Sequence, residues 1–259
     1  MEFDKTHTFQ FVLFRAKASP ISLSSLSELV AKPVAGDNLS LSAFQSPTQS
    51  HQVRLNLPGS TPAPVLIHEL RAASGIWRLT VAPDRIDLVF DAQGFKEVTG
   101  KDRTLEEVYE RVKANLRAVG PELGVGINRV ALVVTGRATA PATGAAELVA
   151  KVFFSEEVQG DAKAAGETVE LTARVTRLKE WHFSQGSARV NHIQRADARV
   201  VYSSGKTKPW LEWQWDFNTS PLSPALLSAE QVGEFFEKAT QLTSQGMADL
   251  SKTYSEIYP

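Results

Sequence analysis

The sequence contains no cysteine, and this excludes several kinds of chemistry at once. Disulfide bonds, thiolate metal ligands and a cysteine nucleophile are all ruled out, and the composition is compatible with a reducing compartment. The first residues lack the basic start and the continuous apolar run of a signal peptide. No stretch reaches the roughly 20 apolar residues that cross a bilayer. We therefore expect a cytoplasmic protein with no membrane segment.

An excess of charge of either sign is also missing. The chain has 28 basic and 29 acidic residues among 259, so its overall charge favours neither nucleic acid nor an anionic membrane. Its hydrophobic content of 42% and charged content of 22% are near the averages for globular proteins. This length is enough for a core that needs no covalent staples.

Recognisable metal and phosphate motifs are absent as well. Glycines between Gly120 and Gly126 follow a predicted helix and precede a predicted strand, whereas a dinucleotide fingerprint needs the opposite order. No His-Glu-x-x-His occurs, and no histidine pair has the spacing of a helical zinc site. His182 and His192 are the one pair that could face each other, across a hairpin. The histidines are His7, His51, His68, His182 and His192. We expect no metal site and no cofactor.

Recognisable catalytic motifs are absent too. There is no Gly-x-Ser-x-Gly nucleophile elbow in the chain. Glu212 and Asp216 lie four residues apart on one strand, which places their Cα atoms about 13 Å apart. That separation is long for a glycosidase pair, so we interpret both as solvated strand residues. We assign no catalytic residue, and an enzyme with an unrecognised site stays as an alternative.

The C-terminal fifth carries the strongest structural signal. Residues Trp210 to Phe217 alternate with period two, which indicates a half-buried strand. Ser228 and Gln231 form a capping-box pattern that opens a long helix ending at about Tyr254. The apolar stripe of that helix is Val232, Phe235, Phe236, Ala239 and Leu242. We expect the main core to close here.

The first half of the chain also reads as strands and helices. Thr8 to Lys17 is rich in residues that favour strands, and Ile76–Val81 with Arg85–Asp91 forms a hairpin. Thr104 and Glu107 predict the start of a helix that Gly120-Pro121 stops after Val119. A short helix near Ser25 and weak strands at Leu39–Phe44 and His51–Leu57 are also predicted.

The second half repeats this order of elements. Ile127–Arg137 is a strand, and a helical segment ending at Lys151 shares Glu-Leu-Val-Ala-Lys with the segment ending at Lys32. Glu167–Phe183 and Ser187–Tyr202 form a long hairpin. The sequence therefore predicts an α+β fold made by tandem duplication, with repeats at 1–124 and 125–259 in one integrated unit. Each repeat runs strand, helix, antiparallel strands, long helix.

Two such repeats would merge into one large curved antiparallel sheet with the long helices on one face. This order resembles the TATA-binding-protein-like layout, an analogy that implies nothing about DNA binding.

A family resemblance covers about half of the chain. The strand ending Trp215-Asp216-Phe217-Asn218-Thr219, the following Pro- and Leu-bearing link, and Ser228–Tyr258 resemble the end of an uncharacterised bacterial family. Members of that family are similar in length, occur sporadically, and end in an Asp-Ile-Asn-Thr strand and a long helix. Phe217 stands here where isoleucine is usual. Ile76–Arg137 also resembles that family, and the resemblance implies no activity and no site residues.

One predicted sheet face is rich in arginine. The candidate binding residues on it are Arg174, Arg189, Arg195, Arg199 and Trp210. Arginine beside tryptophan is typical of protein interfaces and of base-stacking surfaces. Between Glu167 and Phe217, eight Lys/Arg stand against six Asp/Glu, a weak excess for binding a phosphate backbone. A solvated sheet with cross-strand ion pairs explains the same pattern.

These patterns favour a non-enzymatic cytosolic binding module with a protein partner. The sporadic occurrence of the resembling family suggests an accessory or antitoxin-like role in bacterial defence or stress. Nucleotide or nucleic-acid binding through the arginine-rich face is the alternative, and a homodimer is a further option.

Overall fold

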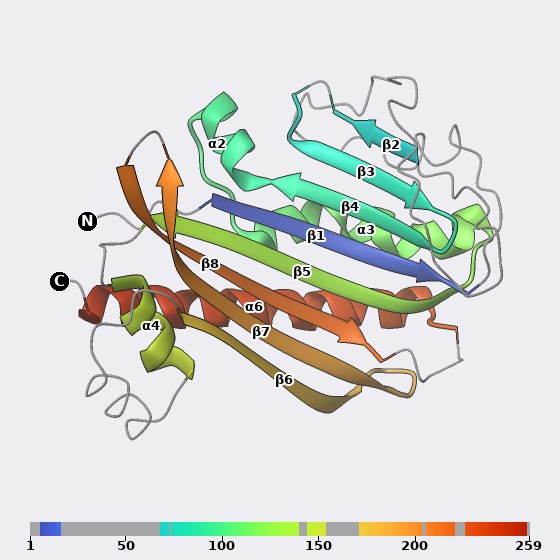
Figure 1. The fold of residues 1–259 in the computed structure, drawn as a ribbon. Coiled ribbons are helices and arrows are strands. Elements are labelled where there is room, and N and C mark those ends of the chain that lie inside the picture. The colour runs from blue at the N-terminus through green and yellow to red at the C-terminus, as the bar shows by residue number, and fades with distance from the viewer. Residues whose placement is uncertain are drawn as a thin grey trace, which may run out of the picture.

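The computed structural model describes residues 6–16, 68–72, 74–139, 144–153, 171–203, 206–220 and 226–257 (Figure 1). The strands are β1 (Thr6–Arg15), β2 (His68–Arg71), β3 (Trp77–Ala82), β4 (Arg85–Asp91), β5 (Ile127–Thr139), β6 (Leu171–His182), β7 (Ser187–Ser203) and β8 (Lys206–Thr219). The helices are α2 (Ala92–Thr99), α3 (Leu105–Leu123), α4 (Gly144–Phe153) and α6 (Ala229–Ile257).

All of these strands belong to one eight-stranded sheet with the order β2-β3-β4-β1-β5-β8-β7-β6. Every neighbouring pair is antiparallel. The prediction of an α+β protein with one large antiparallel sheet is therefore confirmed. Counted outward from the central pair β1 and β5, the strands are β4, β3, β2 on one side and β8, β7, β6 on the other.

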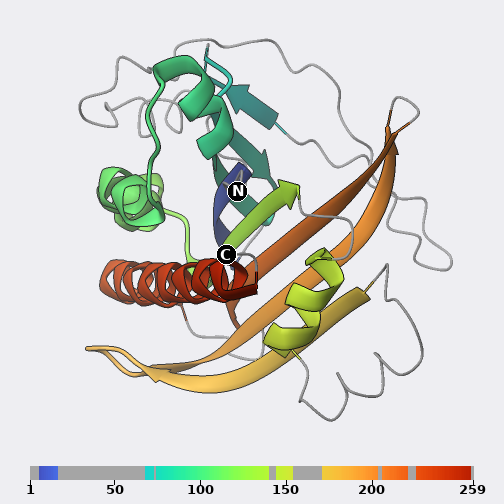
Figure 2. The ribbon, with the colours of Figure 1, turned by 90° about the vertical axis from the view of Figure 1, so that its left-hand side faces the viewer.

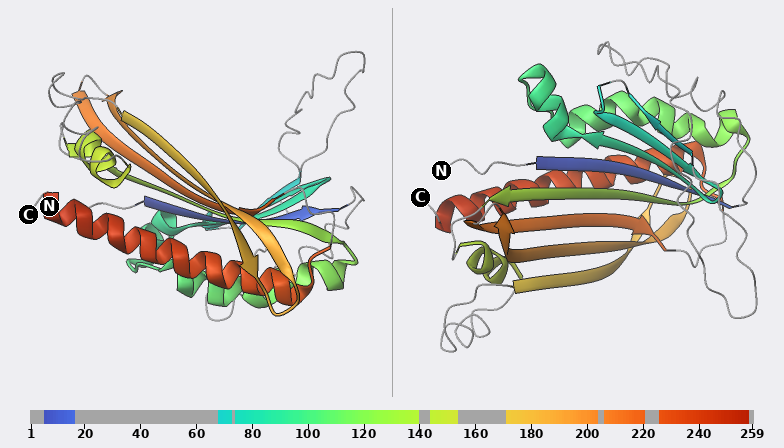
Figure 3. Two further views of the ribbon diagram at one scale, coloured as in Figure 1. Left: turned by 90° about the horizontal axis from the view of Figure 1, so that it is seen from below. Right: turned by 45° about the horizontal axis from the view of Figure 1, so that its top comes forward.

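The two long helices lie on the same side of the sheet (Figures 2 and 3). We call this side the covered face, and it is typified by Phe11, Leu132 and Phe217, which pair across the three central strands. We call the opposite side the open face; its neighbouring row includes Val12, Ala131 and Asn218, and these three side chains are nevertheless buried. None of the described helices lies on the open face.

The core lies between the covered face and the helices. Phe236 of α6 stands edge-on to Phe11 of β1, with ring centroids 5.6 Å apart, and both side chains are fully buried. The hydroxyl of Tyr109 in α3 donates to the carbonyl of Gly233 in α6 at 2.9 Å. One buried polar bond thus fixes the two long helices to each other, because neither group has water as an alternative partner.

The helix starts follow the predicted capping chemistry, but the predicted end of α3 was wrong. Thr104 and Glu107 form both bonds of a capping box, and Ser228 and Gln231 do the same for α6. However, α3 passes through Gly120 and Pro121 to Leu123. Pro121 has no N–H to donate to the carbonyl of Arg117 four residues earlier, so the helix lacks that bond and continues for only two residues after the proline. The helix ends at Gly124, whose φ of 62° suits a residue without a side chain.

Some strand and helix bounds also differ from the sequence prediction. β1 begins and ends two residues earlier than predicted, and α6 runs to Ile257. β2 and α2 were not predicted at all. The predicted helix near Ser25 and the predicted strands at Leu39–Phe44 and His51–Leu57 lie outside the described residues.

Candidate binding surfaces

The predicted binding arginines lie in the outer half of the open face. Arg174 of β6 is paired with Arg195 of β7, and Arg189 is paired with Glu180, in a continuous antiparallel register. All three arginines are exposed to solvent. Arg199 is paired with Trp210 through the backbone, and their side chains lie outside the described residues. We call Arg174, Arg189 and Arg195 the arginine patch; Arg174 and Arg195 are direct neighbours, whereas Arg189 lies six residues from Arg195 along β7, about 20 Å away.

Carboxylates accompany the cations across the open face. Arg195 lies 3.4 Å from Asp197, which also accepts a bond from Thr172. Among the described residues, the open face also has ion pairs of Arg137 with Glu212 at 3.0 Å and of Arg85 with Asp87 at 2.7 Å. The face is thus a mosaic of both signs. Arg195 and Arg137 are exposed, and ion pairs of exposed arginines typically contribute about 0–1 kcal/mol each, whereas Asp87 in the third pair is buried.

A second arginine pair, which the sequence reasoning missed, flanks Phe14. Arg85 and Arg129 are the direct cross-strand neighbours of Phe14 on its two sides. Their guanidinium carbons lie 5.5 and 4.5 Å from the centre of the ring, which is cation–π distance. The sequence does contain a signal for this pair. Phe14 is an aromatic residue on the side of β1 that otherwise carries mostly polar residues, and it follows Leu13, which faces the core.

Asn218 is the centre of a polar network on the open face. Its side-chain oxygen accepts from Arg129 at 3.1 Å and from Asn191 at 3.0 Å, and its amide donates to Asp216 at 2.8 Å. Asn218 is buried, and Arg129, Asn218 and Asn191 come from β5, β8 and β7. The network therefore ties three strands together at one point, where an unpaired group would be costly.

Asp216 corrects one expectation from the sequence. It was interpreted as a solvated strand residue, but burial raises the pKa of its carboxyl group. The hydrogen bond from Asn218 and the positive charge of Arg129 lower the same pKa without cancelling the effect of burial. The pKa of the Asp87 carboxyl group is raised in the same way, because burial raises it more than the neighbouring Arg85 lowers it. Glu212, the other carboxylate of that expectation, forms an ion pair with Arg137.

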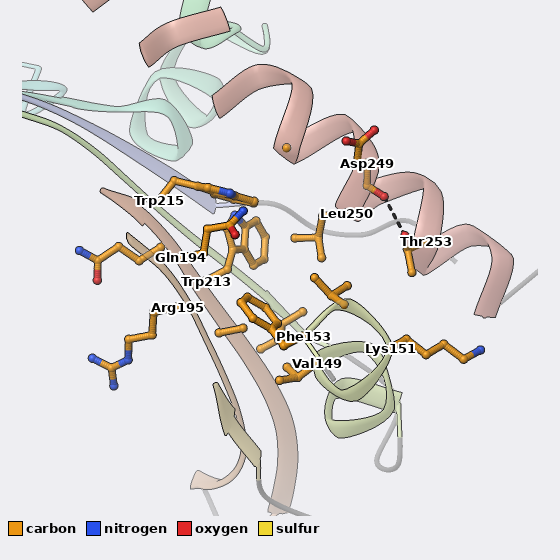
Figure 4. A pocket seen from close by; sticks show the side chains of 15 residues that line it. Val149, Lys151, Phe153, Gln194, Arg195, Trp213, Trp215, Asp249, Leu250 and Thr253 are labelled. Carbon is orange, nitrogen blue, oxygen red and sulfur yellow. Dashed lines mark hydrogen bonds between the residues drawn. The ribbon is translucent and has the colours of Figure 1, made fainter. Parts of the chain in front are cut away.

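The covered face contains a cavity of about 380 Å³ between α4, α6, β7 and β8 (Figure 4). Its walls include Trp213 and Trp215, whose rings stand at 75° to each other with centroids 6.3 Å apart. Phe153 from α4 and Leu250 from α6 close the opposite sides. This cavity was not predicted, because its walls come from four elements that are separated in the sequence.

His192 lies on the covered face, away from the cavity. Its ring stacks on Phe217 with centroids 4.1 Å apart. Burial, together with the nearby charges of Arg177 and Lys179, lowers the pKa of its imidazole to about 4. Its cross-strand neighbour is Arg177, so it does not face His182 across the hairpin. In the described ranges, no three or more His, Cys, Asp or Glu side chains gather as metal ligands would.

A membrane-crossing helix is also not found in the part of the chain that the structure describes. Comparison with protein-family models and with curated proteins found no match to this chain.

Proposed function

We propose that this protein is a non-enzymatic cytosolic binding module whose arginine patch docks a partner protein. The observation that carries the proposal is the exposure of Arg174, Arg189 and Arg195 on a sheet face without a described helix over it. Leu178 of β6, paired with Asn191 of the open face, is 56% exposed and adds apolar surface beside the patch. Arginine next to an exposed aliphatic side chain is a composition that protein interfaces favour.

The mosaic of charges favours a protein over a nucleic acid. A phosphate backbone approaching Arg195 would meet Asp197, and one approaching Arg137 would meet Glu212. A protein surface that carries both signs can satisfy the cations and the carboxylates together. In the setting suggested by the family resemblance, the partner is a protein that this chain accompanies or restrains in bacterial defence or stress.

We further propose that the fold arose by internal duplication, with repeats at 1–124 and 125–259. The strand order supports this, because β1, β4, β3, β2 run outward from the centre as β5, β8, β7, β6 do. α3 follows the first set as α6 follows the second, and both lie on the covered face. The TATA-binding-protein-like layout remains an analogy of this order. The test is to superimpose the two halves. If β1, β4 and α3 cannot be placed on β5, β8 and α6 at the same time, the duplication is contradicted.

The binding test starts with capture of the partner from the native host, followed by titration with purified components. We expect Arg195→Ala to weaken the complex by more than ~1–2 kcal/mol, because central arginine anchors dominate such interfaces. Folding stability should change by no more than ~0.5 kcal/mol, since the side chain lies in water. Lys252→Ala is the control, as it removes a cation from an exposed position of α6.

Several results would overturn the proposal. Unchanged affinity in Arg195→Ala for every captured partner would show that the face is only a solvated sheet. A steep loss of affinity with salt, measured on an oligonucleotide, would establish the nucleic-acid alternative instead. Sedimentation that detects a dimer, lost in Arg195→Ala but kept in Lys252→Ala, would make the partner a second copy of this chain.

A further inference from the structure

We propose that the cavity between α4, α6, β7 and β8 binds a small, uncharged, flat aromatic molecule. The cavity lies on the covered face, and the arginine patch lies on the open face, so this inference does not rest on the proposed protein docking. The argument comes from the size of the cavity, the kind of side chains in its walls, the way these are held, and the direction of the charged groups around it.

The size and the lining are those of a ligand site. A volume of about 380 Å³ falls in the range of roughly 300–1,000 Å³ that small-molecule pockets occupy. The apolar walls are Val149, Phe153, Leu211, Trp213, Trp215 and Leu250. Figure 4 shows the Phe153 ring and Leu250 pointing toward the space that the two indoles border. The two indoles stand at 75° to each other, and aromatic ligands gain from both face and edge contacts with such rings.

Two glycines hold the indoles in place. A Cβ at Gly136 of β5 would stand 2.2 Å from the Trp213 ring, and a Cβ at Gly246 of α6 would stand 3.1 Å from Trp215 Nε1. Both distances are tighter than ordinary contacts, so the rings press against bare backbone. Glycine is unfavourable inside a strand or a helix, so its presence at these two positions is explained by the space that the rings need. The walls of the cavity are therefore fixed before a ligand arrives, which reduces the entropy lost on binding.

The polar groups around the cavity favour a ligand without charge. Lys151, Arg195 and Asp249 border the cavity, but Figure 4 shows their charged ends directed away from it. The side-chain oxygen of Gln194 accepts a bond from Arg177, which leaves the amide nitrogen of Gln194 as a donor at the cavity wall. An ionised ligand would lose its hydration here with no opposite charge facing it. A ring that bears one hydrogen-bond acceptor matches this lining.

The binding test uses two dyes with the same aromatic frame. N-phenyl-1-naphthylamine is neutral, and 1-anilinonaphthalene-8-sulfonate carries a sulfonate. We expect the neutral dye to bind the full chain saturably, with rising dye emission, and at least about tenfold more tightly than the sulfonate. Equal binding of the two dyes, or no saturable binding of the neutral dye, would overturn the proposal.

Two matched substitutions locate the site. Leu250→Trp places a large ring in the cavity and should reduce affinity for the neutral dye by at least about tenfold, with unfolding temperature unchanged or raised. Leu242→Trp is the control, because Leu242 lies on the same helix, is 45% exposed and does not line the cavity. Affinity that is equal in both variants would place the dye elsewhere and refute the assignment.

A third variant covers the case in which Leu250→Trp does not fold. Phe153→Ala removes a partly exposed wall on α4 and should weaken the neutral dye by several fold while the protein stays folded. Dye affinity that is unaffected by Phe153→Ala would also refute the site. Competition by a long-chain alcohol as strong as that by naphthalene would show a lipid-like ligand and would reject the flat aromatic class.

Discussion

Individual side chains on the open face take their chemistry from neighbours that are distant in the sequence. Apolar and polar residues alternate along β8, and Asp216 is one of the polar ones, so the pattern predicts a carboxylate in water. Arg129 and Asn218 are 89 residues apart, yet their hydrogen bond forms the network in which Asp216 is held. Arg174, Arg189 and Arg195 could be placed on one face because alternation within a strand is local. The burial of Asp216 could not, because it depends on which strands become neighbours.

The imidazole of His192 gives a pH prediction. Its pKa is about 4 in the folded protein against an ordinary value of 6.5, so the unfolded chain binds the proton more readily. Stability contributed by this residue is therefore complete above about pH 6.5 and is lost as the pH falls toward about 4. We expect the urea unfolding midpoint of His192→Gln to fall less between about pH 6.5 and pH 4 than that of the unchanged protein.

The exposed His182 supplies the control for this measurement. Urea unfolding midpoints of His182→Gln should fall with pH as those of the unchanged protein do. Equal pH dependence in His192→Gln and in the unchanged protein would mean that the imidazole of His192 is not responsible.

Helices and strands with long periodic patterns were the elements that the sequence predicted well. α6 and its capping residues Ser228 and Gln231 were found because an apolar stripe and a cap agree over many residues. Only the last member of that predicted stripe was wrong, since Leu242 is 45% exposed. α2 has only eight residues, and its N-cap Asp91 is also the last residue of β4, so the strand pattern concealed it. β2 has four residues and pairs only with β3 among the described strands.

Phe235 tests the assigned core face of α6. The ring is fully buried, with Trp181 and Phe236 rings centred 5.5 and 5.3 Å from it. We expect Phe235→Ala to lower the free energy of unfolding by ~3–5 kcal/mol, because it removes apolar burial and leaves a cavity. Denaturant unfolding measures this, with Glu237→Ala at an exposed position of the same helix as the control. A loss below about 1 kcal/mol would show that the ring is not part of the core.

For the chain as one unit, the sequence predicted the elements, their order and the two hairpins β3–β4 and β6–β7, but not how the remaining strands pair into one sheet. The antiparallel sheet and the helix-covered side follow from alternation and from amphipathic helices. The pairing of β1 with β5 joins Thr6–Arg15 to Ile127–Thr139, and no local pattern encodes that contact. The same limit explains why the cavity was missed, since α4, β7, β8 and α6 form it only after the sheet has closed.

The central pairing predicts that the second half cannot fold alone. Without β1, the strand β5 would become an edge, and Leu132 and Val134 would lose the facing rings of Phe11 and Phe9. α6 would also lose Phe11 against Phe236 and the hydrogen bond from Tyr109 to Gly233. Residues 125–259 by themselves should therefore show no cooperative thermal transition and no near-ultraviolet circular dichroism from their tryptophans. Mixing them with residues 1–124 should restore both signals, because the β1–β5 pair and the α3–α6 contact can re-form. If residues 125–259 instead melt cooperatively near the temperature of the full chain, each repeat carries its own complete core, and the integrated unit proposed here is wrong.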